Sequence, residues 1–262
     1  MTASKQAISK FQKMIFAWWK DNRRDLPWRR THDPYKIAVS EVMLQQTQVS
    51  RVLPKYKEFL HHFPTLDALA NASPAAVLRV WKGMGYNKRA LYLRELARIG
   101  KFPKTESELV KLPGLGKYTA RAVLVFAYKQ NVALVDTNIR QIITHFFFHD
   151  EPQKESVIQG VADQLLPKGK SWQWHQALMD YNAIAMPKSK TQMTNKKSIP
   201  FQETNRYFRG QIIDRLRDKP QREKTLFRGF NKPRKYLKSL LVNLERDGLI
   251  TRSKTGIVSL PE

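Results

Sequence analysis

A short glycine-containing turn between two apolar segments constrains this chain more than any other stretch. It is the turn in the sequence LPGLGKYTA, Leu112 to Ala120, and an alanine-rich apolar run continues to Tyr128. Pro113 fixes one φ angle, and the two glycines permit a tight turn and close approach of the backbone to a ligand. The apolar run predicts a helix from Lys117. The turn should therefore lie at a helix N-terminus, where unpaired N–H groups and the helix dipole favour a phosphate.

A carboxylate follows this turn at a position that also suggests function. Asp136 comes directly after the apolar residues 133–135 and just before a second predicted helix, Asn138 to Phe148. This placement predicts an N-cap, where an ionised side chain is stabilised. A carboxylate close to a phosphate-binding turn suggests chemistry on a unit of a nucleic-acid backbone.

The charge of the chain favours a polyanionic partner. Its 262 residues carry a formal net charge of +25, with a sequence pI near 10.3, and 42% of the residues are hydrophobic. That apolar content is sufficient for a folded core, and no apolar stretch approaches the length of a membrane span. The chain has no cysteine and no signal-peptide core near its start, which predicts a cytoplasmic, nucleoid-associated protein without disulfides.

Apolar residues at helical spacing predict an all-α body up to residue 185, because strand-like alternation is nearly absent there. Helices are expected over 8–21, 35–46, 49–63, 75–82, 88–99, 107–111, 117–128, 138–148, 155–166 and 172–185. A basic, polar connection follows over 186–202. The predicted domains are therefore 1–185, the connection 186–202 and a small basic domain, 203–262.

The C-terminal segment predicts a winged-helix-like unit. Helices are expected over 205–216, 223–227 and 235–247, and two strands over 249–252 and 256–260. Two interpretations stay open for this unit, a solvated packing module or a DNA-contacting domain. Its excess of Lys and Arg favours DNA contact.

Glu41 lies on the predicted helix 35–46 among the apolar residues Val39, Val42 and Met43. An acid near a helix start is commonly a surface group, but these neighbours could raise its pKa and make it a proton donor. Cleavage of a purine N-glycosidic bond needs an acid for the leaving base and an anion for the cationic sugar. Glu41 and Asp136 could divide those roles, although sequence spacing alone does not show that they meet.

Six segments in collinear order resemble the MutY-type adenine DNA glycosylases of the helix-hairpin-helix superfamily. They lie between Leu26 and Ala185 and read LPWR, DPYKIAVSEVMLQQTQV, WKGMGYNKRA, LPGLGKYTARA, VDTNIR and QALMDYNAIA. The resemblance implies a mainly α, two-lobed helix-hairpin-helix glycosylase fold for residues 1–185. It also implies a protein that binds double-stranded DNA containing a mismatch or an oxidised guanine and flips adenine out of the stack. A monomer is expected.

The resemblance assigns catalytic roles by position. Glu41 matches the acid that protonates adenine, Asp136 the carboxylate that stabilises or captures the cationic sugar, and Asn138 their polar partner. Tyr118 stands where bifunctional relatives carry a Schiff-base lysine, which favours base removal without strand cleavage. Lys117 is adjacent but falls on another helix face, so weak lyase activity stays an open alternative.

The same resemblance implies two sets of binding residues. The substrate-binding set comprises Trp28, Arg29, Leu44 and Asp180 at the adenine pocket, Gln46 inserted into the duplex, and Thr47, Met84 and Tyr86 at the opposite guanine. The DNA-binding set at the hairpin comprises Gly114, Gly116, Lys117 and Thr119.

Two departures from the family change what is expected. Met186, Met193, Lys196 and Gln202 occupy the four positions where the family has iron–sulfur cysteines, so no cluster and no protein-bound metal are predicted. The carbonyls of the hairpin are kept as a candidate site for a monovalent or divalent ion. DNA-facing charge is expected instead from Lys188, Lys190, Lys196 and Lys197. A Nudix-like domain is not found, which leaves open the preference for 8-oxoguanine over guanine opposite adenine.

The sequence therefore predicts a monofunctional enzyme that hydrolyses the glycosidic bond of adenine mispaired with 8-oxoguanine or guanine. Two alternatives remain, a thymine/uracil glycosylase acting on mismatches with G and a catalytically silent protein that binds DNA structure.

Overall fold

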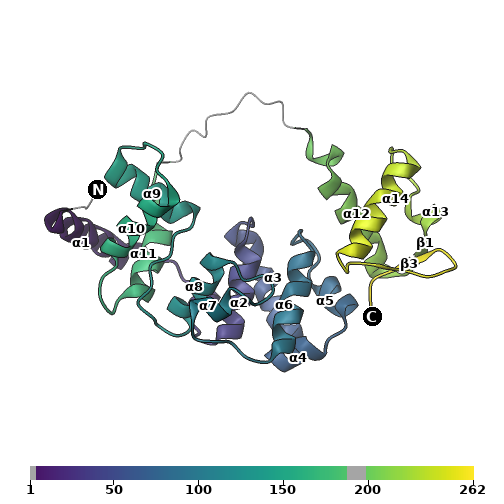
Figure 1. Ribbon diagram of the computed structural model, residues 1–262, viewed down its shortest axis with the longest axis horizontal. Coiled ribbons are helices and arrows are strands. Elements are labelled where there is room, and N and C mark those ends of the chain that lie inside the picture. Colours follow the sequence, from purple (N-terminus) through teal and green to yellow (C-terminus); the bar gives the residue numbers. More distant parts are fainter. Residues whose placement is uncertain (1–3, 188–198) are drawn as a thin grey trace. The chain divides into compact units, whose positions relative to one another are not determined.

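A computed structural model describes residues 4–187 and 199–262, which form helices and one small sheet (Figure 1). These residues gather into two compact units that are not continuous in sequence. The first contains the residues up to Glu41 together with 102–187, and the second contains Val42–Lys101 together with 199–262. The boundary falls inside one helix, α2 (Pro34–Leu44), between Glu41 and Val42.

The first unit is entirely helical in its described residues. It consists of α1 (Lys5–Asn22), the short 3-10 helix η1 (Pro27–Arg29), the first part of α2, α7 (Glu106–Leu109), α8 (Lys117–Phe126), α9 (Thr137–Phe148), α10 (Glu155–Leu165) and α11 (Ser171–Ile184). Helix α11 packs against α1, α8 and α9. At its centre the ring of Phe11 lies 5.8 Å from Trp174 and 5.1 Å from Phe146, so aromatic contacts join these helices.

The second unit combines helices with a three-stranded sheet. Its helices are α3 (Val49–His62), α4 (Leu66–Asn71), α5 (Pro74–Val80), α6 (Lys88–Ile99), the 3-10 helix η2 (Phe201–Glu203), α12 (Asn205–Asp218), α13 (Glu223–Leu226) and α14 (Arg234–Arg246). Strands β1 (Gln221–Arg222), β2 (Thr251–Arg252) and β3 (Ile257–Ser259) are antiparallel in the order β1-β3-β2. In the register Gln221 pairs with Val258, and Thr251 pairs with Ser259.

Most of the predicted helices are present, and the differences have local causes. Helix α2 ends at Leu44 and does not reach Gln46, because Gln46 has left-handed backbone with φ of 54°. Helix α4 was not predicted because it spans only six residues. Helix α7 begins at Glu106 without a side-chain cap, since the Thr105 hydroxyl donates to the Glu108 carboxylate and caps no backbone N–H. The C-terminal sheet gains β1, a two-residue strand too short for a sequence pattern.

The compact units also differ from the predicted sequential domains. Residues 199–262 share a unit with α3 to α6, and α12 packs against both α5 and α14. Arg217 on α12 bonds this C-terminal helix to α5 and to the residue before α6. Its side chain is buried and donates from Nε to the carbonyl oxygen of Leu78 (2.9 Å) and from a terminal nitrogen to Oδ1 of Asn87 (3.0 Å). Independent folding of 203–262 and the winged-helix assignment stay predictions.

We expect Arg217→Ala to lower the free energy of unfolding by about 2–4 kcal/mol, because it leaves buried acceptors without donors. The exposed Arg228 on the same C-terminal segment provides a matched control, and Arg228→Ala should change stability by less than about 0.5 kcal/mol. Urea denaturation measures both. Equal midpoints for the two variants would show that Arg217 does not hold α12 in place.

Candidate active site

Three side chains with proposed catalytic roles lie close together within the first unit. The sequence linked them only through the family resemblance. Glu41 comes from α2, Tyr118 from the first turn of α8, and Asp136 from the N-cap of α9. The Tyr118 hydroxyl is hydrogen-bonded to Glu41, and Asp136 is close enough for its charge to act on the Glu41 carboxyl. Glu41 is only 7% exposed. The site therefore holds two carboxyl groups and a phenol in mostly buried surroundings.

Burial and the neighbouring acid make Glu41 a proton donor near neutral pH. Desolvation is the larger cause and the negative charge of Asp136 the second; together they raise the pKa of Glu41 to about 7, against the lowering effect of the Tyr118 hydrogen bond. Burial and the same two carboxylates raise the pKa of Tyr118 well above its usual range. The phenol thus stays neutral and donates its proton to a hydrogen bond.

Asp136 is held as the N-cap that the sequence predicts. Its Oδ1 accepts from the backbone N–H of Ile139 and its Oδ2 from the side-chain amide of Asn138, both at 2.8 Å. Burial raises the pKa of Asp136, and these hydrogen bonds oppose the rise by stabilising the carboxylate. Because two neighbouring carboxyls resist joint ionisation, this arrangement favours one protonated group, Glu41, beside one anion, Asp136.

A neutral histidine positions the segment that leads to Asp136. Nε2 of His175 accepts from the backbone N–H of Leu134 (2.9 Å), so its Nδ1 donates to the carbonyl oxygen of Ser171 (2.6 Å). Burial lowers the pKa of His175 to about 4, which keeps the ring uncharged at neutral pH. Sequence analysis did not identify this residue. Its signal is weak, a single histidine on an apolar helix.

The glycine-containing turn has the predicted geometry at the start of α8. Gly114 has a left-handed φ of 76°, and Gly116 is the N-cap of α8 with no side chain to cap the first turn. Gly116 and Lys117 are exposed, so backbone N–H groups and a cation lie at the surface beside Tyr118. Thr119 differs, because it is only 2% exposed and faces the interior.

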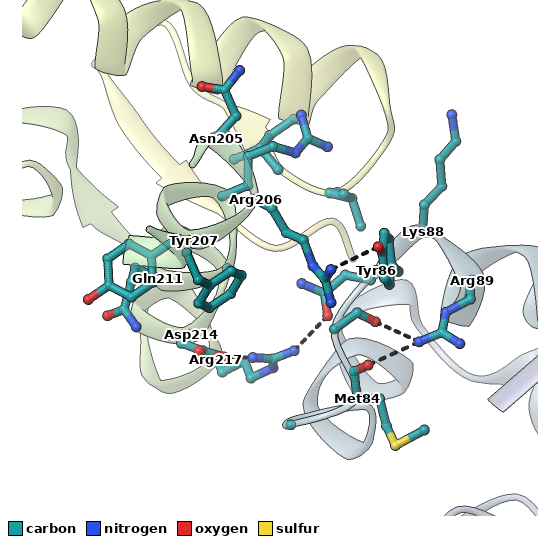
Figure 2. Close-up of a pocket in the computed structure, with 18 of the residues that line it drawn as sticks. Met84, Tyr86, Lys88, Arg89, Asn205, Arg206, Tyr207, Gln211, Asp214 and Arg217 are labelled. Carbon is teal, nitrogen blue, oxygen red and sulfur yellow. Dashed lines mark hydrogen bonds and ion pairs between the residues drawn. The ribbon is translucent and has the colours of Figure 1, made fainter. Parts of the chain in front are cut away.

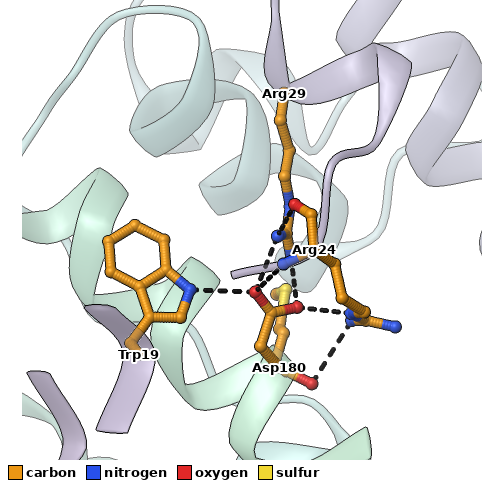
Figure 3. Close-up of polar contacts among 5 residues, drawn as sticks. Trp19, Arg24, Arg29 and Asp180 are labelled. Atoms are coloured by element: carbon orange, nitrogen blue, oxygen red, sulfur yellow. Dashed lines mark hydrogen bonds and ion pairs between the residues drawn. The ribbon is translucent and has the colours of Figure 1, made fainter. Parts of the chain in front are cut away.

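Asp180 and Arg29 form a buried ion pair (Figure 3). Arg29 donates two hydrogen bonds of 2.8 Å to the Asp180 carboxylate, and Asp180 also accepts from Trp19 Nε1 at 2.8 Å and from the side chain of Arg24. Burial acts to raise the pKa of Asp180, but the bonds from Arg29, Arg24 and Trp19 outweigh it and lower the pKa. Asp180 is fully buried, so its observed contacts orient Arg29 next to the buried Trp28.

In the second unit, one buried arginine organises the segments that carry the other predicted binding residues. Arg89 donates to the carbonyl oxygens of Val42 and Gln45 at the end of α2, and to those of Met84 and Gly85 in the turn before α6. It therefore fixes Gln46 and Thr47, which follow α2, and Tyr86, which follows Gly85. Sequence analysis did not single out Arg89, because its partners are backbone atoms.

The remaining predicted binding residues differ in accessibility. Gln46 and Tyr86 are exposed, Tyr86 by 40%; Leu44 and Thr47 are half-buried, and Met84 is 3% exposed. Lys188, Lys190, Lys196 and Lys197 lie outside the described residues. Within 4–187 and 199–262, no three His, Asp or Glu side chains are grouped to hold a metal ion. No helix in the same ranges is long and apolar enough to cross a membrane.

Comparison with known proteins places this site in a family. Residues 39–167 match the family described as HhH-GPD superfamily base excision DNA repair protein, and this stretch contains Glu41, Tyr118 and Asp136. A thymine/uracil-DNA glycosylase of Methanothermobacter thermautotrophicus is 32% identical over 66% of this chain and 83% of its own length. The chain belongs to the HhH-GPD superfamily.

Two further relatives show how the match is distributed. An adenine DNA glycosylase of Mycolicibacterium smegmatis is 41% identical over 64% of this chain and 61% of its own length. The solved structure of a thermostable thymine-DNA glycosylase has a TM-score of 0.66 and 30% identity, and covers 71% of this chain and 90% of its own. The chain spans between 45% and 61% of the length of three adenine DNA glycosylases that it matches.

The raised pKa of Glu41 predicts a pH-dependent gain in stability for Glu41→Gln. Between its ordinary value of 4.5 and about 7, the unfolded state ionises while the folded state keeps its proton, so wild type loses stability as pH rises. The glutamine does not titrate. The free energy of unfolding of the variant relative to wild type should rise across this window, by about 3 kcal/mol once the rise is complete above pH 7. Denaturation at pH 5 and pH 8 measures it, and an unchanged difference would contradict a raised pKa.

Proposed function

We propose that this chain is a monofunctional adenine DNA glycosylase that removes adenine mispaired with 8-oxoguanine or guanine in double-stranded DNA. The observation that carries the proposal is the meeting of a protonated Glu41 with an anionic Asp136 inside a member of the HhH-GPD superfamily. Adenine DNA glycosylases recur among the relatives, and their identity reaches 46% over 136 residues. The collinear segments around Trp28, Glu41 and Asp136 support adenine as the base.

The two carboxyl groups divide the reaction. Glu41 donates its proton to the leaving adenine as the glycosidic bond breaks, and the bonding electron pair departs with the base. Asp136 stabilises the positive charge that develops on the sugar, and Asn138 keeps that carboxylate oriented. Water then adds to the sugar carbon and loses a proton. Tyr118 offers a phenol and no amine at this site, so no Schiff base forms there and the strand is not cleaved.

DNA binding is proposed to use the turn at α8 and the strong positive charge of the chain. The exposed N-terminus of α8 at Gly116 and Lys117 suits a phosphate, together with Gly114 in the turn. Thr119 supports the turn from the interior, in accord with its burial. We propose that the enzyme acts as a monomer in the cytoplasm at the nucleoid, and that basic side chains in 188–197 replace an iron–sulfur loop as DNA contacts.

The adenine pocket is proposed to include Trp28 and Arg29 of the first unit, where Asp180 accepts two hydrogen bonds from Arg29 and so orients its guanidinium. Leu44, at the end of α2, keeps its proposed role in substrate binding. Gln46 enters the duplex, and Thr47, Met84 and Tyr86 face the opposite base. The geometry suits the exposed Gln46 and Tyr86 best, whereas Met84 would act from beneath the surface.

A second candidate is removal of thymine or uracil opposite guanine. One observation favours it. The match covers 83% of the length of the thymine/uracil-DNA glycosylase, but only 61% of the length of the adenine DNA glycosylase of M. smegmatis. A protonated Glu41 favours adenine, because a purine leaving group offers a basic ring nitrogen to an acid.

A panel of mismatched duplexes separates the two candidates. We expect base release, detected as alkali-labile strands under single-turnover conditions, at A opposite 8-oxoguanine and at A opposite G. Duplexes with T or U opposite G should give no product. Release only from T or U would replace the proposal by the second candidate, and no release from any duplex would leave a DNA-binding protein without this activity.

Glu41→Gln and Asp136→Asn should each reduce adenine release by at least about 10³-fold, because the first removes the acid and the second the anion. DNA affinity, measured on the same duplex by fluorescence anisotropy, should change by less than about threefold. For wild type, the rate should fall as pH rises above about 7, where Glu41 loses its proton. A near-normal rate in either variant would refute the assigned role.

A further inference from the structure

A cleft of about 720 Å³ lies wholly within the second unit (Figure 2). One wall is the turn Gly83–Tyr86 and the start of α6, and the other is Phe201 of η2 together with α12. The cleft therefore lies between the sequence motif that contains Tyr86 and the C-terminal segment 199–262. Figure 2 shows Arg206 extending from α12 to Tyr86 on the opposite wall.

Arg206 is sandwiched among aromatic rings that remain accessible. Its guanidinium lies 4.0 Å from the centre of the Tyr86 ring and 5.6 Å from that of Phe201, and it donates to the Tyr86 hydroxyl at 2.8 Å. Tyr86 is 40% exposed and Phe201 is 53% exposed. Exposed rings beside a planar cation form a surface on which a nucleobase can stack.

The positive charge of the cleft exceeds its acidic groups. Asp247 pairs with Lys88 and Arg209, and Asp214 pairs with Arg217. Arg206 and Arg51, which also line the cleft, form no ion pair with any acid in the described ranges.

Arg206 also acts on the neighbouring Arg89. Burial is the main reason why the pKa of Arg89 is lowered to about 10; Tyr86 acts to raise it, and the positive charge of Arg206 acts to lower it. An anion bound in the cleft would relieve this repulsion.

We propose that this cleft binds one nucleotide of a DNA strand, with its base stacked on the exposed ring of Phe201 and its phosphate held by Arg206 and Arg51, while Tyr86 holds the Arg206 guanidinium in place. The inference rests on the proposed action on DNA. It makes the C-terminal segment a contributor to substrate binding through Arg206 and Phe201, two residues outside the matched family region. It also gives the cation a defined role, because a guanidinium stacks and binds phosphate at once.

The test measures binding of a labelled A:G duplex by the full chain carrying Glu41→Gln, which prevents turnover. Adding Arg206→Ala should weaken binding about 5–10-fold and flatten the slope of log Kd against log salt by about one. Arg206→Lys should keep the slope while still weakening binding, because the charge remains and the planar stack is lost. Arg228→Ala, a matched loss of charge outside the cleft, should change affinity less than twofold. Equal effects of Arg206→Ala and Arg228→Ala would overturn the proposal.

A second variant keeps the test decisive if the Arg206 substitutions disturb folding, which a thermal melt reveals. Phe201→Leu removes an exposed ring and no charge, so it should weaken binding several-fold with an unchanged salt slope. Full affinity in that variant would exclude stacking in the cleft. Adenine release by the wild-type chain is assayed separately. Absence of adenine release would contradict the proposed function and leave the inference about the cleft untouched. Normal DNA binding by the cleft variants would contradict that inference and leave the proposed function untouched.

Discussion

The repulsion between two carboxyl groups in largely buried surroundings is the constraint around which the candidate active site of the first unit is arranged. Glu41 lies on α2 and Asp136 is the N-cap of α9. Glu41 is buried and Asp136 is half-buried, so water screens the repulsion between the two carboxyl groups only in part. Their proximity makes protonation of one and ionisation of the other the favoured state. The N-cap bonds at the start of α9 favour ionisation of Asp136, so Glu41 keeps the proton although the Tyr118 hydrogen bond acts in the opposite direction.

Buried guanidinium groups hold the irregular backbone in both units. Arg29 is bound to Asp180 in the first unit, while Arg89 and Arg217 in the second unit bind mainly carbonyl oxygens and amide groups. Arg29 also donates to the carbonyl oxygen of Arg24 just after α1, and Arg89 and Arg217 reach carbonyl oxygens at or near the ends of α2 and α5, which helical bonding leaves unpaired. A chain with a large excess of cations thus uses some of them internally, and the remainder stay available for a polyanion.

How far the sequence predicts this structure differs between its elements. Long helices with clear apolar periodicity, such as α9 and α14, and the N-cap role of Asp136 were predicted from local patterns, which the structure confirms. The meeting of Glu41 with Asp136 could be expected only through resemblance, because the two residues are 95 positions apart and only the tertiary fold brings them together. His175 and Arg89 escaped prediction for a related reason: their partners are backbone atoms brought near by the fold, and such partners leave no residue pattern. The two-residue strand β1 is fixed by its pairing with β3 and not by its own composition.

The left-handed backbone at Gln46 and Tyr86 has a consequence for binding. Neither residue is glycine, so φ angles of 54° and 45° are energetically unfavourable, by about 1–3 kcal/mol each. Arg89 fixes the carbonyl just before each residue, Gln45 in one case and Gly85 in the other. The conformational cost of presenting both exposed side chains is therefore met when the chain folds. A ligand that engages them encounters a preorganised surface and loses less affinity to ordering the protein.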